Sequence, residues 1–80
     1  MFPTEPDLLR LTAEVCGEDS IDPDEELLES GLLDSFGMIS LFLALEDRYG
    51  LELHPTQFPV ERLSTPHSIV QLILEAWDNR

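Results

Sequence analysis

Apolar residues recur along this chain at intervals of three and four, the spacing that places them on one face of an α-helix. The first such segment follows Thr4, a good cap residue, and has Pro6 in its first turn and Asp7 completing a T-x-x-D capping box. Its apolar face consists of Leu8, Leu11, Thr12 and Val15. Gly17 follows, and glycine commonly ends helices. We therefore expect a first helix from about Glu5 to Cys16.

The same period predicts two further long helices. One runs from about Ser35 to Tyr49 and ends at Gly50. The last begins after Thr65 as cap, with Pro66 at the first helical position, where proline is well tolerated. Its core-facing residues are expected to be Ile69, Leu72, Ile73 and Ala76.

The connections between these helices are rich in proline and glycine. Residues 17–34 are expected to form a long loop, with a short helical turn around Asp24–Leu28. Loops of this length are uncommon in compact domains and are often functional. After residue 50, the prolines leave room for one short helical turn, near Gln57–Arg62. No strand pattern is stronger than these helical periods. The expected fold is all-α, a small four-helix bundle with a long first loop and a short third helix.

The helix over residues 35–49 carries two apolar groups, one more than a packed helix needs. The first group comprises Met38, Leu41, Phe42, Leu45 and Tyr49, within an arc of roughly 100° that suffices to pack on other helices. The second comprises Phe36, Ile39 and Leu43; Ser35 and Glu46 lie between the groups, and Ser40 and Asp47 border the second. An exposed apolar group beside acids marks a docking surface. The alternative is that the loop over residues 17–34 covers it.

Composition narrows the classes of partner. The chain has 80 residues, and a chain of this length is expected to form one domain, over residues 1–80. Seventeen acidic and four basic residues, all arginines, give a net charge of −13. Such a surface repels nucleic acid and anionic lipid and favours basic protein surfaces. The start of the chain resembles no signal peptide, and no segment is long enough to insert into a membrane. A single cysteine suits a reducing compartment, so a cytoplasmic protein is expected, and the small size of the second apolar group predicts a monomer.

Ser35 is a candidate either for capping a helix or for chemistry. Serine and aspartate before an apolar run are typical of helix caps, so Asp34-Ser35 has an ordinary structural interpretation. A hydrolytic nucleophile needs a base and an oxyanion site, but His54 and His67 fit no triad pattern and G-x-S-x-G is absent. The acidic run DPDEELLE lacks a calcium-loop pattern, and no metal site is expected. Cys16 is expected to be a small buried apolar residue. The chain is therefore not expected to be an enzyme.

The segment ESGLLDSFGMISLFLALEDRYGLEL resembles the carrier-protein family, which has an aspartate–serine pair and a large apolar residue at the start of its second helix. Here Phe36 stands where leucine is usual. The form GLLDSFG, with glycine after phenylalanine, is most similar to D-alanyl carrier proteins. AEVCGED, LALEDRYG, PTQF and the T-P-x-x-I start of the last helix match that subfamily too, so the likeness extends from about Leu8 to Leu74.

This resemblance implies a bundle of acyl-carrier type and a specific role for each site residue. A transferase would attach 4′-phosphopantetheine to Ser35 through a phosphodiester bond, and the thiol at the end of this arm would hold the cargo as a thioester. Asp34 would help to bind the transferase and its metal–coenzyme complex. Partner enzymes, which are the transferase, an adenylating ligase, and a downstream acyltransferase or synthase, would dock on Asp34, Phe36, Ile39, Leu43, Glu46 and Asp47.

The cargo stays open between two alternatives. The subfamily likeness favours an activated amino acid, with D-alanine first, passed from an ATP-dependent ligase to an acceptor enzyme. A general acyl or peptidyl carrier in fatty-acid, polyketide or nonribosomal peptide synthesis is the alternative, since Met38 and Ile39 replace the Thr-Val common in the subfamily and Ser40 is neutral where an acid is frequent. A third possibility is an acidic adaptor that never receives an arm.

Overall fold

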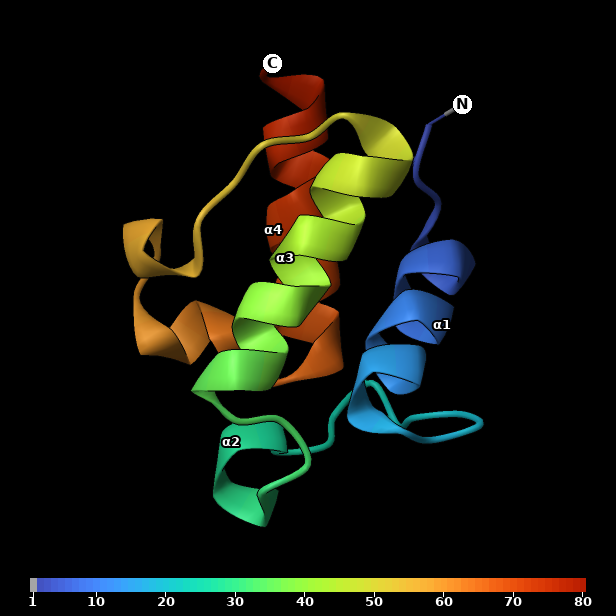
Figure 1. Ribbon diagram of the computed structural model, residues 1–80, viewed down its shortest axis with the longest axis vertical. Coiled ribbons are helices and arrows are strands. Elements are labelled where there is room, and N and C mark those ends of the chain that lie inside the picture. The colour runs from blue at the N-terminus through green and yellow to red at the C-terminus, as the bar shows by residue number, and fades with distance from the viewer. Residues whose placement is uncertain (1) are drawn as a thin grey trace.

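The computed structural model describes residues 2–80, and these form helices and turns without strands. Three long helices lie side by side, and short helical segments lie in the connections between them (Figure 1). The α-helices are α1 (Glu5–Cys16), α2 (Leu27–Ser30), α3 (Ser35–Tyr49) and α4 (Pro66–Asp78); the 3₁₀ turns are η1 (Pro55–Gln57) and η2 (Val60–Leu63). The expected all-α fold with four helices is confirmed, and the expected bounds of the first and second long helices are those observed.

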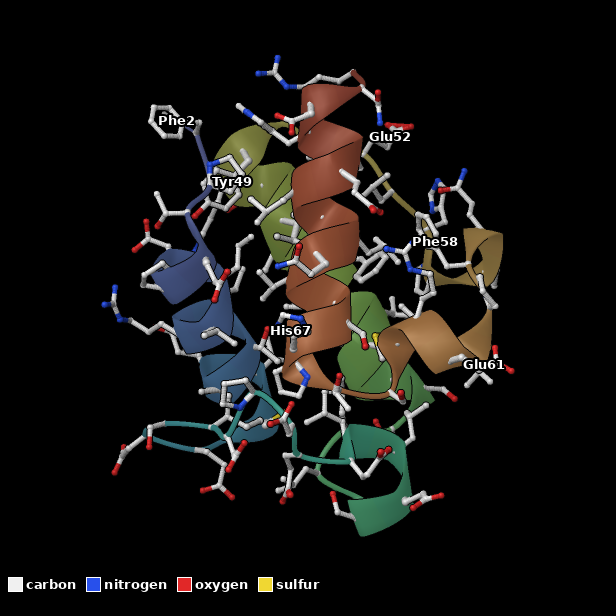
Figure 2. All side chains as sticks on the ribbon, turned by 180° about the vertical axis from the view of Figure 1, so that it is seen from behind. Phe2, Tyr49, Glu52, Phe58, Glu61 and His67 are labelled. Atoms are coloured by element: carbon white, nitrogen blue, oxygen red, sulfur yellow. The ribbon has the colours of Figure 1, made fainter. Side chains whose placement is uncertain are left out.

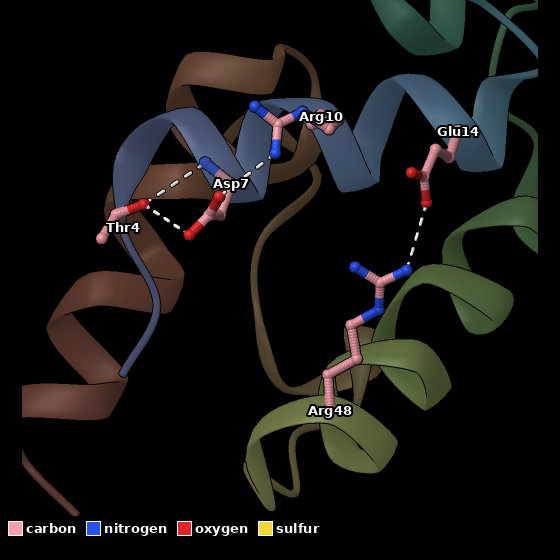
Figure 3. A network of polar contacts seen from close by, with 5 residues as sticks. All are labelled: Thr4, Asp7, Arg10, Glu14 and Arg48. Carbon is pink, nitrogen blue, oxygen red and sulfur yellow. Dashed lines mark hydrogen bonds and ion pairs between the residues drawn. The ribbon is translucent and has the colours of Figure 1, made fainter. Parts of the chain in front are cut away.

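The long helices begin at side-chain caps that satisfy otherwise unpaired backbone N–H groups. The Thr4 hydroxyl accepts a hydrogen bond from the Asp7 N–H at 3.4 Å, and the Thr65 hydroxyl accepts one from the Ser68 N–H at 3.1 Å. The Thr4 hydroxyl also donates to the Asp7 carboxylate at 2.8 Å (Figure 3). The caps expected at Thr4 and Thr65 are therefore confirmed, and these residues fix where α1 and α4 begin.

The short helix in the first connection lies further along the chain than the turn expected over Asp24–Leu28. The Asp24 N–H donates to the Asp22 carboxylate at 2.8 Å, a local turn that keeps this part of the segment out of helical geometry. The Leu27 N–H donates to the Ser64 carbonyl at 2.8 Å, and α2 begins at that residue. A contact between residues distant in the sequence therefore places α2, which no local pattern could reveal.

The second connection holds two 3₁₀ turns where one short turn near Gln57–Arg62 was expected. Pro59 separates them with extended backbone angles. Side chains also tie this connection to the helices: the Phe58 ring contacts the Phe42 ring edge-on with centroids 6.3 Å apart, and the Arg62 guanidinium pairs with the Glu75 carboxylate at 2.6 Å.

One apolar core holds α1, α3 and α4 together, and α1 packs against both of the others. Its buried residues are Leu8, Leu11, Leu27, Leu33, Met38, Leu41, Phe42, Leu45, Leu51, Leu63, Ile69, Val70, Leu72 and Ile73. Tyr49 and Ala76, expected in the core, are half-buried at its edge. The Tyr49 and Trp77 rings meet edge-on near the end of the molecule that also holds Phe2 (Figure 2). On the outside, the Arg48 guanidinium of α3 pairs with Glu14 of α1 at 3.3 Å (Figure 3).

Two leucines of α3, two positions apart, test which side of this helix holds the fold together. Leu45 is fully buried, whereas Leu43 is 60% exposed. We predict that Leu45→Ala lowers the free energy of unfolding by about 3 kcal/mol, because it leaves a cavity in the core. Leu43→Ala removes the same atoms from a position in water and is expected to change it by less than about 0.5 kcal/mol. Urea unfolding followed by circular dichroism measures both; equal losses would contradict the assignment of the core.

Candidate functional site

Ser35 is the first residue of α3 and does not cap it. Asp34 is the cap: its carboxylate Oδ1 accepts a hydrogen bond from the Gly37 N–H at 2.8 Å, and its carbonyl accepts one from Met38 at 2.9 Å. Within residues 2–80, the Ser35 hydroxyl makes no hydrogen bond, and the residue is exposed. The ordinary structural interpretation therefore applies to Asp34, while the hydroxyl of Ser35 is available for chemistry.

The segment before Ser35 is held to the rest of the molecule. The Leu33 side chain is buried, and its N–H donates to the Leu27 carbonyl at 3.1 Å. Leu27 in turn donates to the Ser64 carbonyl, just before α4. Ser35 is the first residue of α3, and this helix begins at the end of the molecule near α2, opposite both termini (Figure 1). The segment that leads into it is fixed by these contacts.

The second apolar group of α3 lies in water. Phe36 is 79% exposed, Ile39 is 51% exposed and Leu43 is 60% exposed. We call these three residues the outer face of α3. The alternative that residues 17–34 cover them is wrong, because that segment instead contributes Leu27 and Leu33 to the core beneath α3. Glu46 and Asp47, the acids expected to border this face, are also exposed.

A further apolar residue, Val60 on η2, extends this surface and was not predicted. It is 60% exposed and, together with Ile39, lines an open groove of about 230 Å³. The groove is lined by Leu28, Ser35, Met38, Ile39, Pro55, Thr56, Val60 and Leu63. Two stretches of the chain, residues 28–39 and 55–63, build it from four separate elements, which is why helical periodicity could not find it. No local signal distinguished Val60 from Leu51, Leu53, Phe58 and Leu63, the other apolar residues of this connection.

The arginines leave the acidic character of the surface largely intact. Arg10 pairs with Asp7 and Arg48 with Glu14, each at 3.3 Å, and Arg62 pairs with Glu75. The Arg80 guanidinium lies 3.5 Å from the centre of the Trp77 ring. These groups are exposed, so each pair stabilises the fold little. The Asp34 side chain, directly before Ser35, is an exposed acid, and the first turn of α3 contains no acidic residue.

The remaining candidate groups form no second reactive site. Cys16 is half-buried at the end of α1, less deeply than expected; burial, with a smaller contribution from the Glu18 carboxylate, raises the pKa of its thiol. His54 and His67 are exposed, and His67 is engaged through its backbone N–H, which donates to the Pro23 carbonyl at 2.9 Å. Over residues 2–80, no three acidic, histidine or cysteine side chains gather as metal ligands, and no helix there is long and apolar enough to cross a membrane.

Comparison with known proteins agrees with this geometry. Residues 6–73 match the family described as "Phosphopantetheine attachment site". A D-alanyl carrier protein of Bacillus velezensis is 42% identical over 71 residues, which is 86% of this chain and 91% of that protein. The D-alanyl carrier proteins of Bacillus subtilis and Bacillus licheniformis are 41% and 35% identical over the same shares of both chains.

The family model covers most of the chain, and the relatives are matched along nearly their whole length. The matched residues 6–73 span the start of α3. The chain therefore belongs to the phosphopantetheine-attachment family of carrier proteins, and its cofactor is 4′-phosphopantetheine.

Proposed function

We propose that Ser35 is the attachment point of 4′-phosphopantetheine and that the protein carries an activated amino acid on this arm. The observation that carries the proposal is the free, exposed hydroxyl of Ser35, next to a cap that leaves it unengaged. A phosphodiester on this oxygen lies at the N-terminus of α3, where backbone N–H groups and the helix dipole favour negative charge. The Asp34 carboxylate directly before Ser35 opposes this charge, and the first turn of α3 adds no further acidic residue.

When attached, the group supplies a flexible arm with a terminal thiol that holds the cargo as a thioester. The chain itself supplies a fixed base: Asp34 caps α3, and Leu33 anchors the preceding segment in the core. A tether of this kind raises the local concentration of the cargo at each active site it reaches. The protein is therefore a non-catalytic substrate of its partner enzymes.

The outer face of α3 together with Val60 is the surface on which partners dock. Phe36 and Ile39 lie within one turn of Ser35, so a protein bound there has the hydroxyl within reach. The surrounding acids Asp34, Glu46 and Asp47 attract a partner with a basic rim. Such partners are a phosphopantetheinyl transferase, an adenylating ligase and a downstream acyltransferase or synthase. Weak docking with electrostatic attraction lets the carrier leave each partner quickly.

The relatives favour an amino acid as cargo, and D-alanine in particular, because those matched over most of the chain are D-alanyl carrier proteins. The alternative is a general acyl or peptidyl carrier. Incubating the arm-bearing protein with a D-alanine-activating ligase, ATP and D-alanine should add one D-alanyl group, while acyl-coenzyme donors with their transferases should add none. Charging by the acyl donors alone would exclude the aminoacyl role.

Replacement of the serine tests the attachment point. Coexpressed with a broad-specificity phosphopantetheinyl transferase, the wild-type protein should gain the mass of one arm, and Ser35→Ala should gain none. Ser40→Ala, which removes another exposed hydroxyl of the same helix, should be modified like the wild type. Intact-mass spectrometry measures all three. An arm on Ser35→Ala, or no arm on the wild type, would reject the proposal.

A further prediction concerns the docking surface. Ile39→Asp should lower kcat/KM of the transferase for this protein at least about tenfold, because a central apolar contact residue typically contributes 1–2 kcal/mol or more. Phe2→Asp is the matched control: Phe2 is 67% exposed but lies at the Tyr49 end of the molecule (Figure 2). Equal rates for the two variants, both with wild-type thermal stability, would show that the outer face of α3 takes no part in docking.

Another prediction distinguishes the thiol of the arm from the protein's own thiol. Because the raised pKa of Cys16 lowers its thiolate fraction near neutral pH, and burial hinders access, iodoacetamide should alkylate the arm first. In the unmodified protein, Cys16 should react more slowly than in the same protein unfolded in urea, with a difference that narrows as the pH rises above the pKa in the folded state. Alkylation of folded Cys16 at the unfolded rate would contradict this.

A further inference from the structure

Gly37 occupies a helical position that has no space for a side chain. A Cβ built on it would lie 2.7 Å from Leu33 Cδ1, closer than carbon atoms can approach, and 3.4 Å from Asp34 Oδ1. The other glycines, Gly17, Gly31 and Gly50, differ in both respects: each has a positive φ, and a Cβ there would meet nothing within 4 Å. Gly37 is therefore not needed for an unusual backbone conformation. It is needed because the Leu33 side chain lies close to the backbone of α3 at this position.

Glycine is a poor choice inside a helix when only helix formation matters, since alanine at the same position is more favourable. The loss of helix propensity at this position is offset by the packing of another side chain into the space that a Cβ would fill. The Leu33 side chain lies against the first turn of α3 at the place where a Cβ would be, and it is only 2% exposed. Because it is packed in the core, it cannot simply rotate away into solvent.

The two residues that Gly37 contacts are the two that come directly before Ser35. The Leu33 side chain lies against the place where a Cβ of residue 37 would be, and the Asp34 carboxylate accepts the hydrogen bond of the Gly37 N–H at 2.8 Å. Leu33 is also joined through its N–H to Leu27. The position of the backbone from Leu33 to Ser35 therefore depends on how closely Leu33 can lie on the first turn of α3.

We infer that Gly37 is a positioning residue for attachment of the arm: by admitting Leu33 against the first turn, it sets where the Ser35 hydroxyl stands relative to a transferase docked on the outer face of α3. The inference rests on the proposed function of Ser35. Gly37 itself is half-buried and has no side chain with which to contact the arm or the reacting oxygen. Its effect passes through Leu33 and Asp34.

The test is the substitution Gly37→Ala, with the transferase rate measured against carrier concentration. Because the outer face of α3 is unchanged, KM should stay close to the wild-type value, while kcat should fall about tenfold to a hundredfold, the range expected for a displacement of up to 1 Å. Ser40→Ala is the matched control: it makes a comparable change toward better helix propensity on the exposed side of the same helix, and should keep both constants.

A second substitution should reverse the effect. Leu33→Val removes the atom at 2.7 Å but keeps a carbon near the place of Cγ, which lies 3.5 Å from the Cβ site, an ordinary contact distance. The double variant Gly37→Ala/Leu33→Val should therefore regain most of the wild-type kcat. The single variant Leu33→Val should not raise kcat above the wild-type value. Backbone amide NMR shifts supply a readout independent of activity: residues 33–36 should move in Gly37→Ala and return toward their wild-type positions in the double variant.

The possible outcomes distinguish the positioning role of Gly37 from the attachment role of Ser35. Wild-type kcat in folded Gly37→Ala, a rise in KM alone, or a folded double variant that stays slow would overturn the positioning role and leave the function of Ser35 standing. If Gly37→Ala does not fold, the double variant decides, because it should fold and be modified at near the wild-type rate. If the wild type itself accepts no arm, the proposed function fails first and this inference fails with it.

Discussion

Burial of one face of α3 against the rest of the core is the constraint on which the remainder of the structure depends. Leu41, Phe42 and Leu45 are buried almost completely, and together they fix the rotation of α3 about its axis. Once that rotation is fixed, Phe36, Ile39 and Leu43 must point into water, and the start of the helix must present Ser35 at the surface. The same packing thus stabilises the fold and determines which residues of α3 are exposed to a partner protein.

A small domain has little stability to spare, yet this one leaves four large apolar side chains of α3 and η2 exposed. In the isolated chain these side chains add almost nothing to stability, so their exposure is best explained by contacts made with other proteins. A net charge of −13 complements that surface, because long-range attraction speeds encounter with basic partners without requiring a tight complex. A carrier that visits several enzymes in turn needs this combination.

The sequence was sufficient wherever the determining interactions are local. Thr4 and Thr65 lie where caps were expected, and the 3.6-residue period separated the buried leucines of α3 from the exposed ones. The sequence could not decide between Asp34 and Ser35 as the cap of α3, since both residue types suit that position. The start of α2 depends on a hydrogen bond to Ser64, and the groove beside Val60 is built from four separate elements. Only coordinates show that a Cβ on Gly37 would collide with Leu33.

The central claim is that the exposed hydroxyl at the start of α3 is the atom to which the arm is joined. Trypsin should release residues 11–48 as one peptide, because Arg10 and Arg48 bound it and the chain has no lysine. That peptide holds four serines, Ser20, Ser30, Ser35 and Ser40, so only its fragmentation can place the modification. Tandem mass spectrometry of the arm-bearing protein should assign the phosphodiester to Ser35, and assignment to any of the other three would contradict the account.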